Sequence, residues 1–204
     1  MRAAKVERTT KETCISIGIE LDSMDGGAQG GGQNKIASGC GFMDHMLTLF
    51  AFHSGISLYV KAVGDTEVDY HHLTEDTGAA MGLCVKQALG EAKGIKRYAS
   101  AFLPMDEALV LVALDVSGRT YLKYDVPVGK PKVGDFDTEL AEEFFSAFCR
   151  TLGLTLHVKL FYGDNAHHII EAVFKGFGRA LGEAVAIDPR KSGAVPSSKG
   201  LLLE

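Results

Sequence analysis

The apolar residues of this chain recur with two periods. Alternation at every second position, or a short apolar run rich in β-branched residues, is typical of a strand. Five stretches fit that pattern, namely residues 13–22, 56–63, 109–116, 121–125 and 154–162. Spacings of three or four between apolar residues are typical of an amphipathic helix. Four stretches fit this second pattern, namely residues 42–52, 78–92, 138–152 and 167–185.

Glycine, proline and serine mark the connections between these elements. Gly55 and Gly153 follow two of the helical stretches and are predicted to end them. Asp137 or Thr138 is placed to cap the helix that Gly153 ends. Strand 121–125 is expected to pair with its successor in a hairpin. Four further stretches, rich in Gly, Pro, Ser or basic residues, are predicted to be loops or turns: 23–39, 94–100, 126–137 and 188–200.

The order of the elements repeats along the chain. The strand segments ISLYVK and LTLHVK match each other, and Lys61 aligns with Lys159 at a difference of 98 positions. The segment ALGEA occurs at 88–92 and again at 180–184. The economical interpretation is an α+β fold of two repeated βα units, with sheets backed by helices. Within one compact domain, we expect a first repeat, a second repeat and a basic tail at residues 1–94, 95–190 and 191–204.

The composition of the 204 residues excludes several classes of protein. With 46% apolar and 23% charged residues, the chain resembles an ordinary globular protein rather than a disordered one. A net charge of −5 disfavours a nucleic-acid binder or a protein of anionic membranes. No apolar run approaches about 18 residues and the N-terminus lacks an apolar signal core, so we expect a cytoplasmic location. The 4 cysteines are scattered without a CxxC spacing, which indicates buried free thiols.

The motif HHxxE occurs twice, at residues 71–75 and 167–171, and these two pentads contain four of the 7 histidines. On a helix, the first histidine and the glutamate of each pentad are i,i+4 neighbours. Imidazole nitrogen with carboxylate oxygen is a ligand set for Zn, Mn, Fe or Co. Adjacent histidines cannot comfortably point at one ion, so the pattern predicts two ions, each with a histidine from either half. His45 fits as a further ligand, whereas His53 and His157 are interpreted as packing or surface residues.

Five longer motifs resemble those of one known family. They are GFMDHMLTLFAFHSG, DYHHLTEDTG, LDVSGRTYL, LHVKLFYGDNAHHIIEAVFKGFGRAL and DPRKSGAVPSSKG. From about Arg8 to the C-terminus, and in the same order, the chain resembles the imidazoleglycerol-phosphate dehydratases of histidine biosynthesis. The resemblance implies repeated units like ribosomal-protein domain 2, with left-handed crossovers. It also implies a homo-oligomeric cage, expected to have about 24 subunits, with active sites shared between subunits.

The resemblance implies a reaction and a metal as well. Such enzymes bind two manganese ions (Mn2+) per active site and dehydrate imidazole glycerol phosphate to imidazole acetol phosphate. The proton to be removed lies on a carbon with no carbonyl beside it, so it is not acidic. The metals would stabilise the imidazolate form of the substrate ring, which could expel the neighbouring hydroxyl and give a diazafulvene-like intermediate. A carboxylate must then move the proton. The resemblance gives that role to Glu12, with Glu75 and Glu171 as alternatives that metal binding would make less basic.

Carried over by position, seven residues would bind metal: His45, His71, His72, Glu75, His167, His168 and Glu171. The expected division gives His71, Glu75 and His167 to one ion and the other four to the second. Glu143 stands where many members have histidine, and it would either ligate manganese itself or leave a water there. Leu49 stands where some members have glutamine, so one polar substrate contact would be missing. The phosphate would be bound by basic and hydroxyl side chains: Arg97, Arg119, Lys175, Ser197 and Lys199.

Two other functions compete with this interpretation. In a metal-storing or metal-bridged assembly protein, the pentads would only join subunits. In a dinuclear hydrolase of phosphate esters, a metal-bound hydroxide would be the nucleophile, and more aspartate ligands would be expected than Asp69 and Asp76. The favoured partners are a small-molecule substrate and further copies of the chain, with neither nucleic acid nor membrane.

Overall fold

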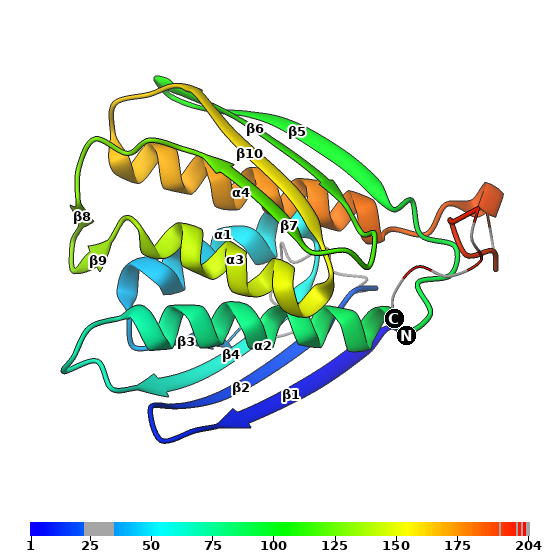
Figure 1. Ribbon diagram of the computed structural model, residues 1–204, viewed down its shortest axis with the longest axis horizontal. Helices are drawn as coiled ribbons and strands as arrows, with labels where there is room; N and C mark the ends of the chain where they lie inside the picture. The colour runs from blue at the N-terminus through cyan, green and yellow to red at the C-terminus, as the bar shows by residue number, and fades with distance from the viewer. Residues whose placement is uncertain (23–34, 192, 199, 201, 203–204) are drawn as a thin grey trace.

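The computed structural model describes residues 1–22, 35–191, 193–198, 200 and 202. Two four-stranded sheets form the outer layers of this part of the chain, and α-helices lie between them (Figure 1). The first sheet has the spatial order β1 (Ala3–Thr9), β2 (Thr13–Glu20), β4 (Ser57–Gly64), β3 (Lys35–Ala37). The second has the order β5 (Tyr98–Met105), β6 (Ala108–Asp115), β10 (Thr155–Tyr162), β7 (Tyr121–Asp125).

The two sheets share one topology. In each, the first three strands are antiparallel, and the edge strand, β3 or β7, runs parallel to its neighbour, β4 or β10. β1 therefore corresponds to β5, β2 to β6, β4 to β10 and β3 to β7. This correspondence confirms the predicted α+β fold of two sheets backed by helices. The handedness of the crossovers stays a prediction.

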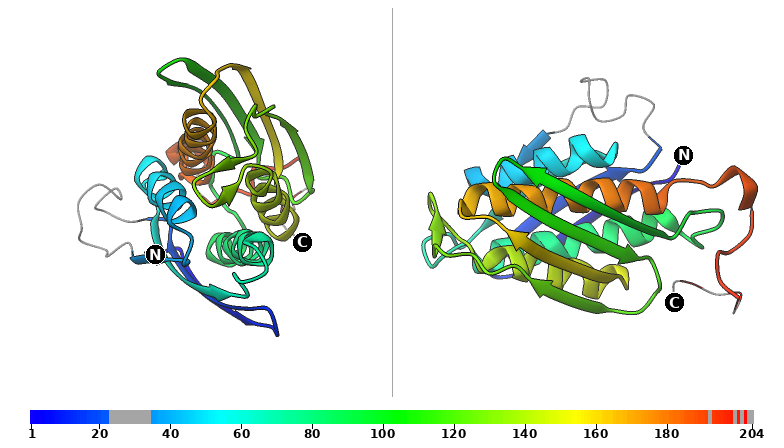
Figure 2. Two further views of the ribbon diagram at one scale, coloured as in Figure 1. Left: turned by 90° about the vertical axis from the view of Figure 1, so that its left-hand side faces the viewer. Right: turned by 90° about the horizontal axis from the view of Figure 1, so that it is seen from above.

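The helices form a double layer between the sheets. They are α1 (Gly41–Ser54), α2 (His71–Leu89), α3 (Leu140–Leu152), α4 (Ala166–Val185) and the short 3-10 helix η1 (Pro189–Lys191). α2 packs on β1 and β2, and α4 packs on β5 and β6. Across the layer, α2 packs on α3 and α1 on α4, so helices of the two halves cover one another (Figure 2). All four α-helices begin at the same end of the molecule, on the left of Figure 1.

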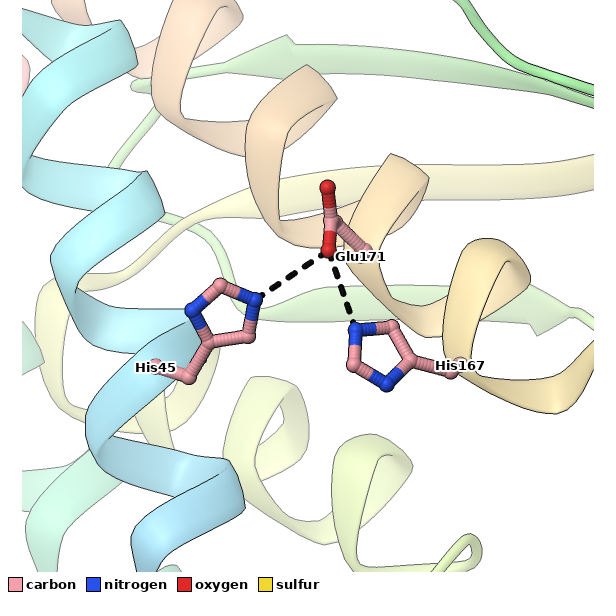
Figure 3. Close-up of side chains that lie close together, drawn as sticks. All are labelled: His45, His167 and Glu171. Atoms are coloured by element: carbon pink, nitrogen blue, oxygen red, sulfur yellow. Dashed lines mark hydrogen bonds and ion pairs between the residues drawn. The ribbon is translucent and has the colours of Figure 1, made fainter.

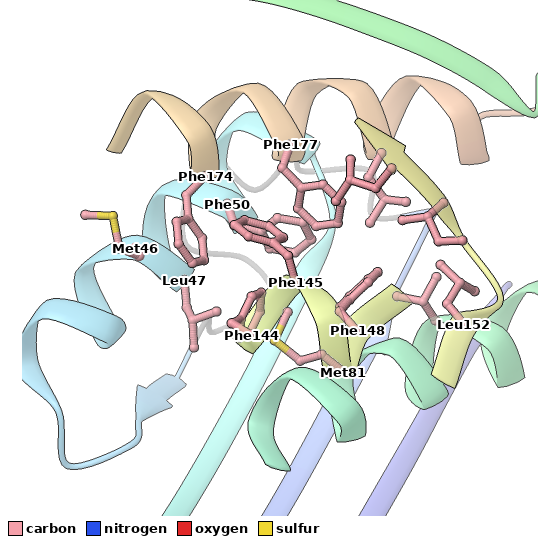
Figure 4. Packing of buried hydrophobic residues seen from close by; sticks show 14 of the residues in the cluster. Met46, Leu47, Phe50, Met81, Phe144, Phe145, Phe148, Leu152, Phe174 and Phe177 are labelled. Atoms are coloured by element: carbon pink, nitrogen blue, oxygen red, sulfur yellow. The ribbon is translucent and has the colours of Figure 1, made fainter. Parts of the chain in front are cut away.

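Phenylalanine rings fill the middle of the helix layer (Figure 4). Phe145 of α3 lies 4.9 Å from Phe174 and 5.1 Å from Phe177 of α4, measured between ring centroids. Phe50 of α1 stacks on Phe177 at 5.6 Å. Each of these rings is nearly fully buried. Burying one such ring is worth about 1.5–3 kcal/mol, so the core fixes α1, α3 and α4 relative to one another.

Close helix packing also depends on glycine. A Cβ at Gly178 of α4 would lie 2.8 Å from the carbonyl oxygen of Phe50 on α1. Gly82 of α2 likewise faces the backbone of α3 at Phe148. At the helix ends, Gly55 and Gly153 adopt φ values of 69° and 78°, a left-handed conformation that glycine takes without strain, and they end α1 and α3 as predicted.

Several sequence-based predictions of local structure were wrong. Segment 121–125 does form a strand, β7, but it pairs in parallel with β10 rather than in a hairpin. Strands β1 and β5 were missed, and β5 takes up the end of the predicted turn 94–100. The helix predicted at 78–92 begins earlier, at His71.

Two predicted connections also need correction. Residues 126–137 contain two short paired strands, β8 (Lys132–Val133) and β9 (Phe136–Asp137). Residues 35–37 of the predicted loop 23–39 form β3, and residues 23–34 lie outside the described part. The N-cap of α3 is Glu139, which makes no side-chain cap bond. The Thr138 hydroxyl instead donates to the carbonyl oxygen of Lys130 at 2.8 Å.

All 4 cysteines are free, as expected. Cys40, Cys84 and Cys149 are buried as predicted, but Cys14 is exposed because it lies on the outer face of β2. Among the described residues, no helix combines the length and apolarity needed to cross a membrane.

Candidate metal centre

The second pentad opens α4 and is held there by Asn165. The side-chain oxygen of Asn165 accepts hydrogen bonds from the backbone N–H groups of His167 and His168, at 2.9 Å and 3.4 Å. This is an N-cap, which satisfies donors that the first helical turn leaves free. One turn further along, Glu171 lies beneath His167, with 3.1 Å between Oε2 and Nε2. The i,i+4 relation seen in the sequence is therefore a real contact.

His45 of α1 completes a group of three donors (Figure 3). Its Nε2 lies 3.2 Å from Oε2 of Glu171, and its ring lies 5.6 Å from that of His167. One donor atom from each of the three residues lies within 4.8 Å of the others. In the part of the chain that the structure describes, no other three His, Cys, Asp or Glu residues meet so closely. Two imidazole nitrogens and a carboxylate oxygen suit a borderline divalent ion such as Mn2+ or Zn2+.

Glu171 is ionised in this setting. Burial favours the neutral acid and raises its pKa, but hydrogen bonds from Lys175 and His45 outweigh burial and lower the pKa below its usual value. The Lys175 ammonium lies 2.5 Å from Oε1, the carboxylate oxygen that does not face the histidines. Lys175 was predicted to bind phosphate, and the structure places it beside the metal centre.

Aromatic side chains line a pocket beside His45 and His167, two of the three donor residues. Phe42 meets the edge of the His167 ring at 5.2 Å and lies 5.1 Å from Phe136. These residues, with His45 and Tyr70, line a pocket of about 390 Å³. A pocket lined by aromatic side chains and two imidazole donors suits a small ring ligand.

The first pentad opens α2 and is more exposed. Asp69 accepts a hydrogen bond from the backbone N–H of His71 at 2.7 Å. Nε2 of His71 lies 3.9 Å from Glu75, and Arg150 of α3 donates to Glu75 at 2.8 Å. No third donor reaches this pair among the described residues. The first pentad therefore presents ligands without closing a site around them.

The second histidine of each pentad, His72 or His168, is called the inner histidine. Each inner histidine is held by a carboxylate from outside its pentad. Nδ1 of His72 lies 3.0 Å from Asp65, and Nδ1 of His168 lies 2.8 Å from Glu107. The Asp65 hydrogen bond raises the pKa of His72, with a smaller contribution from the charge of Glu12. The His168 hydrogen bond lowers the pKa of Glu107 to about 2.

The remaining predicted ligands stand apart from the cluster of three. The expected division placed His167 with His71 and Glu75, whereas in this chain His167 lies with His45 and Glu171. Glu143 is half-buried in the first turn of α3 and does not belong to the cluster. Glu12 is exposed in the bend between β1 and β2.

Two predicted phosphate-binding residues meet at Asp115, the last residue of β6. The Arg97 guanidinium donates to both carboxylate oxygens, at 2.7 Å and 3.1 Å, and to the carbonyl oxygen of Pro196 at 2.8 Å. Arg119 lies 3.8 Å from the same carboxylate. Ser197 follows Pro196, so three of the five predicted phosphate-binding residues gather here. Lys199 lies outside the described residues.

Sequence reasoning missed four polar residues that hold these groups in place. Arg150 pairs with Glu75, Asp115 with Arg97, Asp65 with His72 and Glu107 with His168. None of the four shares a helix or strand with its partner, so no periodicity within one element could have identified it.

A comparison with protein families identifies the chain. The family model described as imidazoleglycerol-phosphate dehydratase matches residues 38–181, which include α1 and both pentads. The chain belongs to the imidazoleglycerol-phosphate dehydratase family. It is 54% identical over 202 residues to the dehydratase of Nitrobacter hamburgensis and 53% identical over 202 residues to that of Listeria welshimeri, with 99% of this chain covered in both cases. The alignments cover 99% and 100% of those relatives.

Solved structures of the family have the same fold. The crystal structure of imidazoleglycerol-phosphate dehydratase from Staphylococcus aureus matches with a TM-score of 0.79 at 42% identity, covering 91% of this chain and 99% of that one. The Pyrococcus furiosus structure, in complex with (S)-C348, matches with a TM-score of 0.80 at 37% identity, covering 97% and 100%. The enzyme class predicted from the sequence, a dehydratase of histidine biosynthesis, is confirmed.

Proposed function

We propose that the chain dehydrates imidazole glycerol phosphate to imidazole acetol phosphate with the help of two manganese ions per active site. The observation that carries this proposal is the group of His45, His167 and Glu171. Both histidines lie at hydrogen-bond distance from Glu171 and line an aromatic pocket, on a chain of the dehydratase family. The mixed nitrogen and oxygen donor set fits Mn2+, with Zn2+, Fe2+ or Co2+ as competitors.

The orientation of the histidines supports two ions rather than one. Within each pentad the two histidines face different carboxylates. In the first, His71 faces Glu75 and His72 faces Asp65. In the second, His167 faces Glu171 and His168 faces Glu107. The ligands would be His45, His71, His72, Glu75, His167, His168 and Glu171, with Glu143 as a further candidate. When bound, the ions would supply Lewis-acid stabilisation of a deprotonated imidazole ring in the substrate.

Glu12 is the best candidate for moving the proton. Its carboxylate is exposed, and its charge is felt by His72, so it lies near the first pentad without being a member. Glu75 and Glu171 are already engaged by Arg150 and Lys175, and metal ligation would lower their basicity. Glu12 would take the proton from a substrate carbon that has no carbonyl group beside it. The hydroxyl on the neighbouring carbon would leave as water.

The separation of the two ends of the substrate site favours active sites shared between subunits. The backbone N–H of Arg97 donates to the carbonyl oxygen of Ala184, at the C-terminal end of α4. His167 lies at the opposite end of that helix, about 25 Å away at 1.5 Å per residue. A substrate with a three-carbon chain between ring and phosphate cannot span that length. The metal centre of one subunit and Arg97, Arg119 and Ser197 of another would therefore face the same substrate.

This arrangement fits the homo-oligomeric cage of about 24 subunits that the family resemblance implies. The enzyme would work in the cytoplasm. The two halves, residues 1–94 and 95–190, would act as one unit because their helices share a core, and residues 191–204 would serve as a substrate-side tail.

The test combines metal content, product and one variant. The metal-free protein should show no dehydratase activity, and reloading with Mn2+ should restore ketone formation together with about two ions per chain. Release of inorganic phosphate in place of a ketone would contradict the lyase proposal and indicate a hydrolase. Glu12→Gln should bind Mn2+ like the wild type while losing dehydration, and unchanged turnover would remove Glu12 from the mechanism.

A further inference from the structure

Both inner histidines of the pentads make the same contact. Nδ1 of His72 faces Asp65 at 3.0 Å, and Nδ1 of His168 faces Glu107 at 2.8 Å. A carboxylate can only accept at these contacts, so Nδ1 carries the proton and donates it. In a neutral imidazole, the lone pair is then on Nε2.

We propose that Asp65 and Glu107 are positioning residues, each of which holds the inner histidine of one pentad by Nδ1 so that Nε2 is presented to a metal ion. The inference rests on the proposed function only in requiring that the pentads bind ions. Carboxylates that accept from the far nitrogen of a ligand histidine fix its tautomer and its ring orientation. Neither residue would touch the ion or the substrate.

Both residues are held by contacts other than the one with histidine. The other carboxylate oxygen of Glu107 accepts from the backbone N–H of Asn165 at 2.8 Å, which ties it to the start of α4. The backbone N–H of Asp65 donates to the carbonyl oxygen of Glu12 at 3.1 Å, and its own carbonyl accepts from Val68 at 2.9 Å. Glu107 is therefore tied to the start of α4 through its carboxylate, whereas Asp65 is held through its own backbone.

Asp65 and Glu107 do not occupy equivalent positions in the two halves of the fold, and the function of Glu12 would explain the difference. Glu107 lies in the turn between β5 and β6, which corresponds to the bend between β1 and β2, where Glu12 lies. In the second half, the hairpin carboxylate is used to hold His168. In the first half, Asp65, which directly follows β4, holds His72 in its place. Glu12 is thereby left available for proton transfer, although it occupies the equivalent hairpin position.

The experiment titrates the metal-free full chain with Mn2+ and measures the free ion by electron paramagnetic resonance. Asp65→Ala and Glu107→Ala should each weaken Mn2+ binding by about 10- to 100-fold. Glu67→Ala, in the same connection as Asp65, and Asp164→Ala, next to Asn165, have exposed side chains and serve as matched controls with wild-type affinity. Asp65→Asn keeps an oxygen acceptor and should lose less affinity than Asp65→Ala.

Double variants separate positioning from a general effect on folding. If Asp65 acts through His72, Asp65→Ala should cost nothing further in a His72→Ala background, and the same should hold for Glu107 and His168. Wild-type affinity in the single variants, or losses that multiply in the double variants, would overturn the inference. If the wild type binds Mn2+ but forms no ketone, the proposed function fails while these affinity results still decide the role of Asp65 and Glu107.

Discussion

Substituting Gly178 by alanine tests whether close helix packing fixes the metal centre. Gly178 lies on α4, two turns after Glu171, and faces α1, which carries His45. A Cβ at this position would lie 2.8 Å from the carbonyl oxygen of Phe50 and 3.3 Å from its Cα. Both are backbone atoms, so no side-chain rotation can relieve the contact and α1 itself must move.

The size of the effect follows from that geometry. Ordinary van der Waals contact begins at 3.4 Å, so α1 must retreat by about 0.6 Å at this crossing. Overpacking of this kind costs about 1–3 kcal/mol, and alanine in place of glycine in a helix returns about 1 kcal/mol. The net loss of stability is about 1 kcal/mol, or about 2–4 °C in Tm. A binding constellation tolerates displacements of only about 0.5 Å, so Mn2+ affinity should also fall, on the order of tenfold.

Urea unfolding and Mn2+ titration of the same preparation would check both effects. Gly129→Ala is the control, because no atom lies within 4 Å of a Cβ added there, and its stability should stay within about 0.5 kcal/mol of wild type. A Gly178→Ala protein with wild-type midpoint and wild-type Mn2+ affinity would refute the link between helix separation and the metal centre.

Three further substitutions are expected to change stability or Mn2+ affinity in different directions. Tyr124→Phe should stabilise the protein by about 1 kcal/mol, because the buried Tyr124 hydroxyl has no hydrogen-bond partner among the described residues; a lower urea midpoint would contradict this. A hydrogen bond from Arg190 holds the pKa of Asp188 at about 2, below its usual 3.8. The stability that this carboxylate contributes is therefore fully present above about pH 3.8 and is lost as the pH falls through about 2. Asp188→Asn should therefore unfold more easily than wild type at pH 7 but not at about pH 2, and equal midpoints at pH 7 would refute the argument. Glu143→Ala should weaken Mn2+ binding whereas Glu142→Ala, at its exposed neighbour, should not; equal affinities would show that Glu143 is not a ligand.

Apolar patterns predicted the interior strands and the edge strand β7 but missed β1 and β5. β6 was predicted from its nearly continuous apolar run, and in the structure its residues alternate between buried and half-buried. β1 buries only Val6 fully and β5 only Leu103, since both lie at the edge of a sheet, so neither has a clear apolar face. Periodicity also cannot identify a partner strand. For this reason the parallel pairing of β7 with β10 could not be read from residues 121–125.

The candidate site was predictable where its residues share one helical turn. His167 and Glu171 meet at 3.1 Å because four residues make nearly one turn of helix. The contact between His45 and Glu171 depends on the packing of α1 against α4, which the sequence does not encode at any fixed spacing. Family resemblance nominated His45, but only the fold explains why it meets the second pentad.

The unequal burial of the two pentads indicates how a complete centre would assemble. The Glu171 side chain is 8% exposed, paired with Lys175 and already joined by His45 and His167. The Glu75 side chain is 34% exposed and paired with Arg150, which is itself 56% exposed, and no third donor arrives from the described chain. A surface ion pair of this kind is worth at most about 1 kcal/mol, so Arg150 can yield to a metal ion or to a neighbouring subunit. The second pentad thus already lies in a group of three donors within one chain, whereas the first would need further ligands, which under the proposed function another copy would supply.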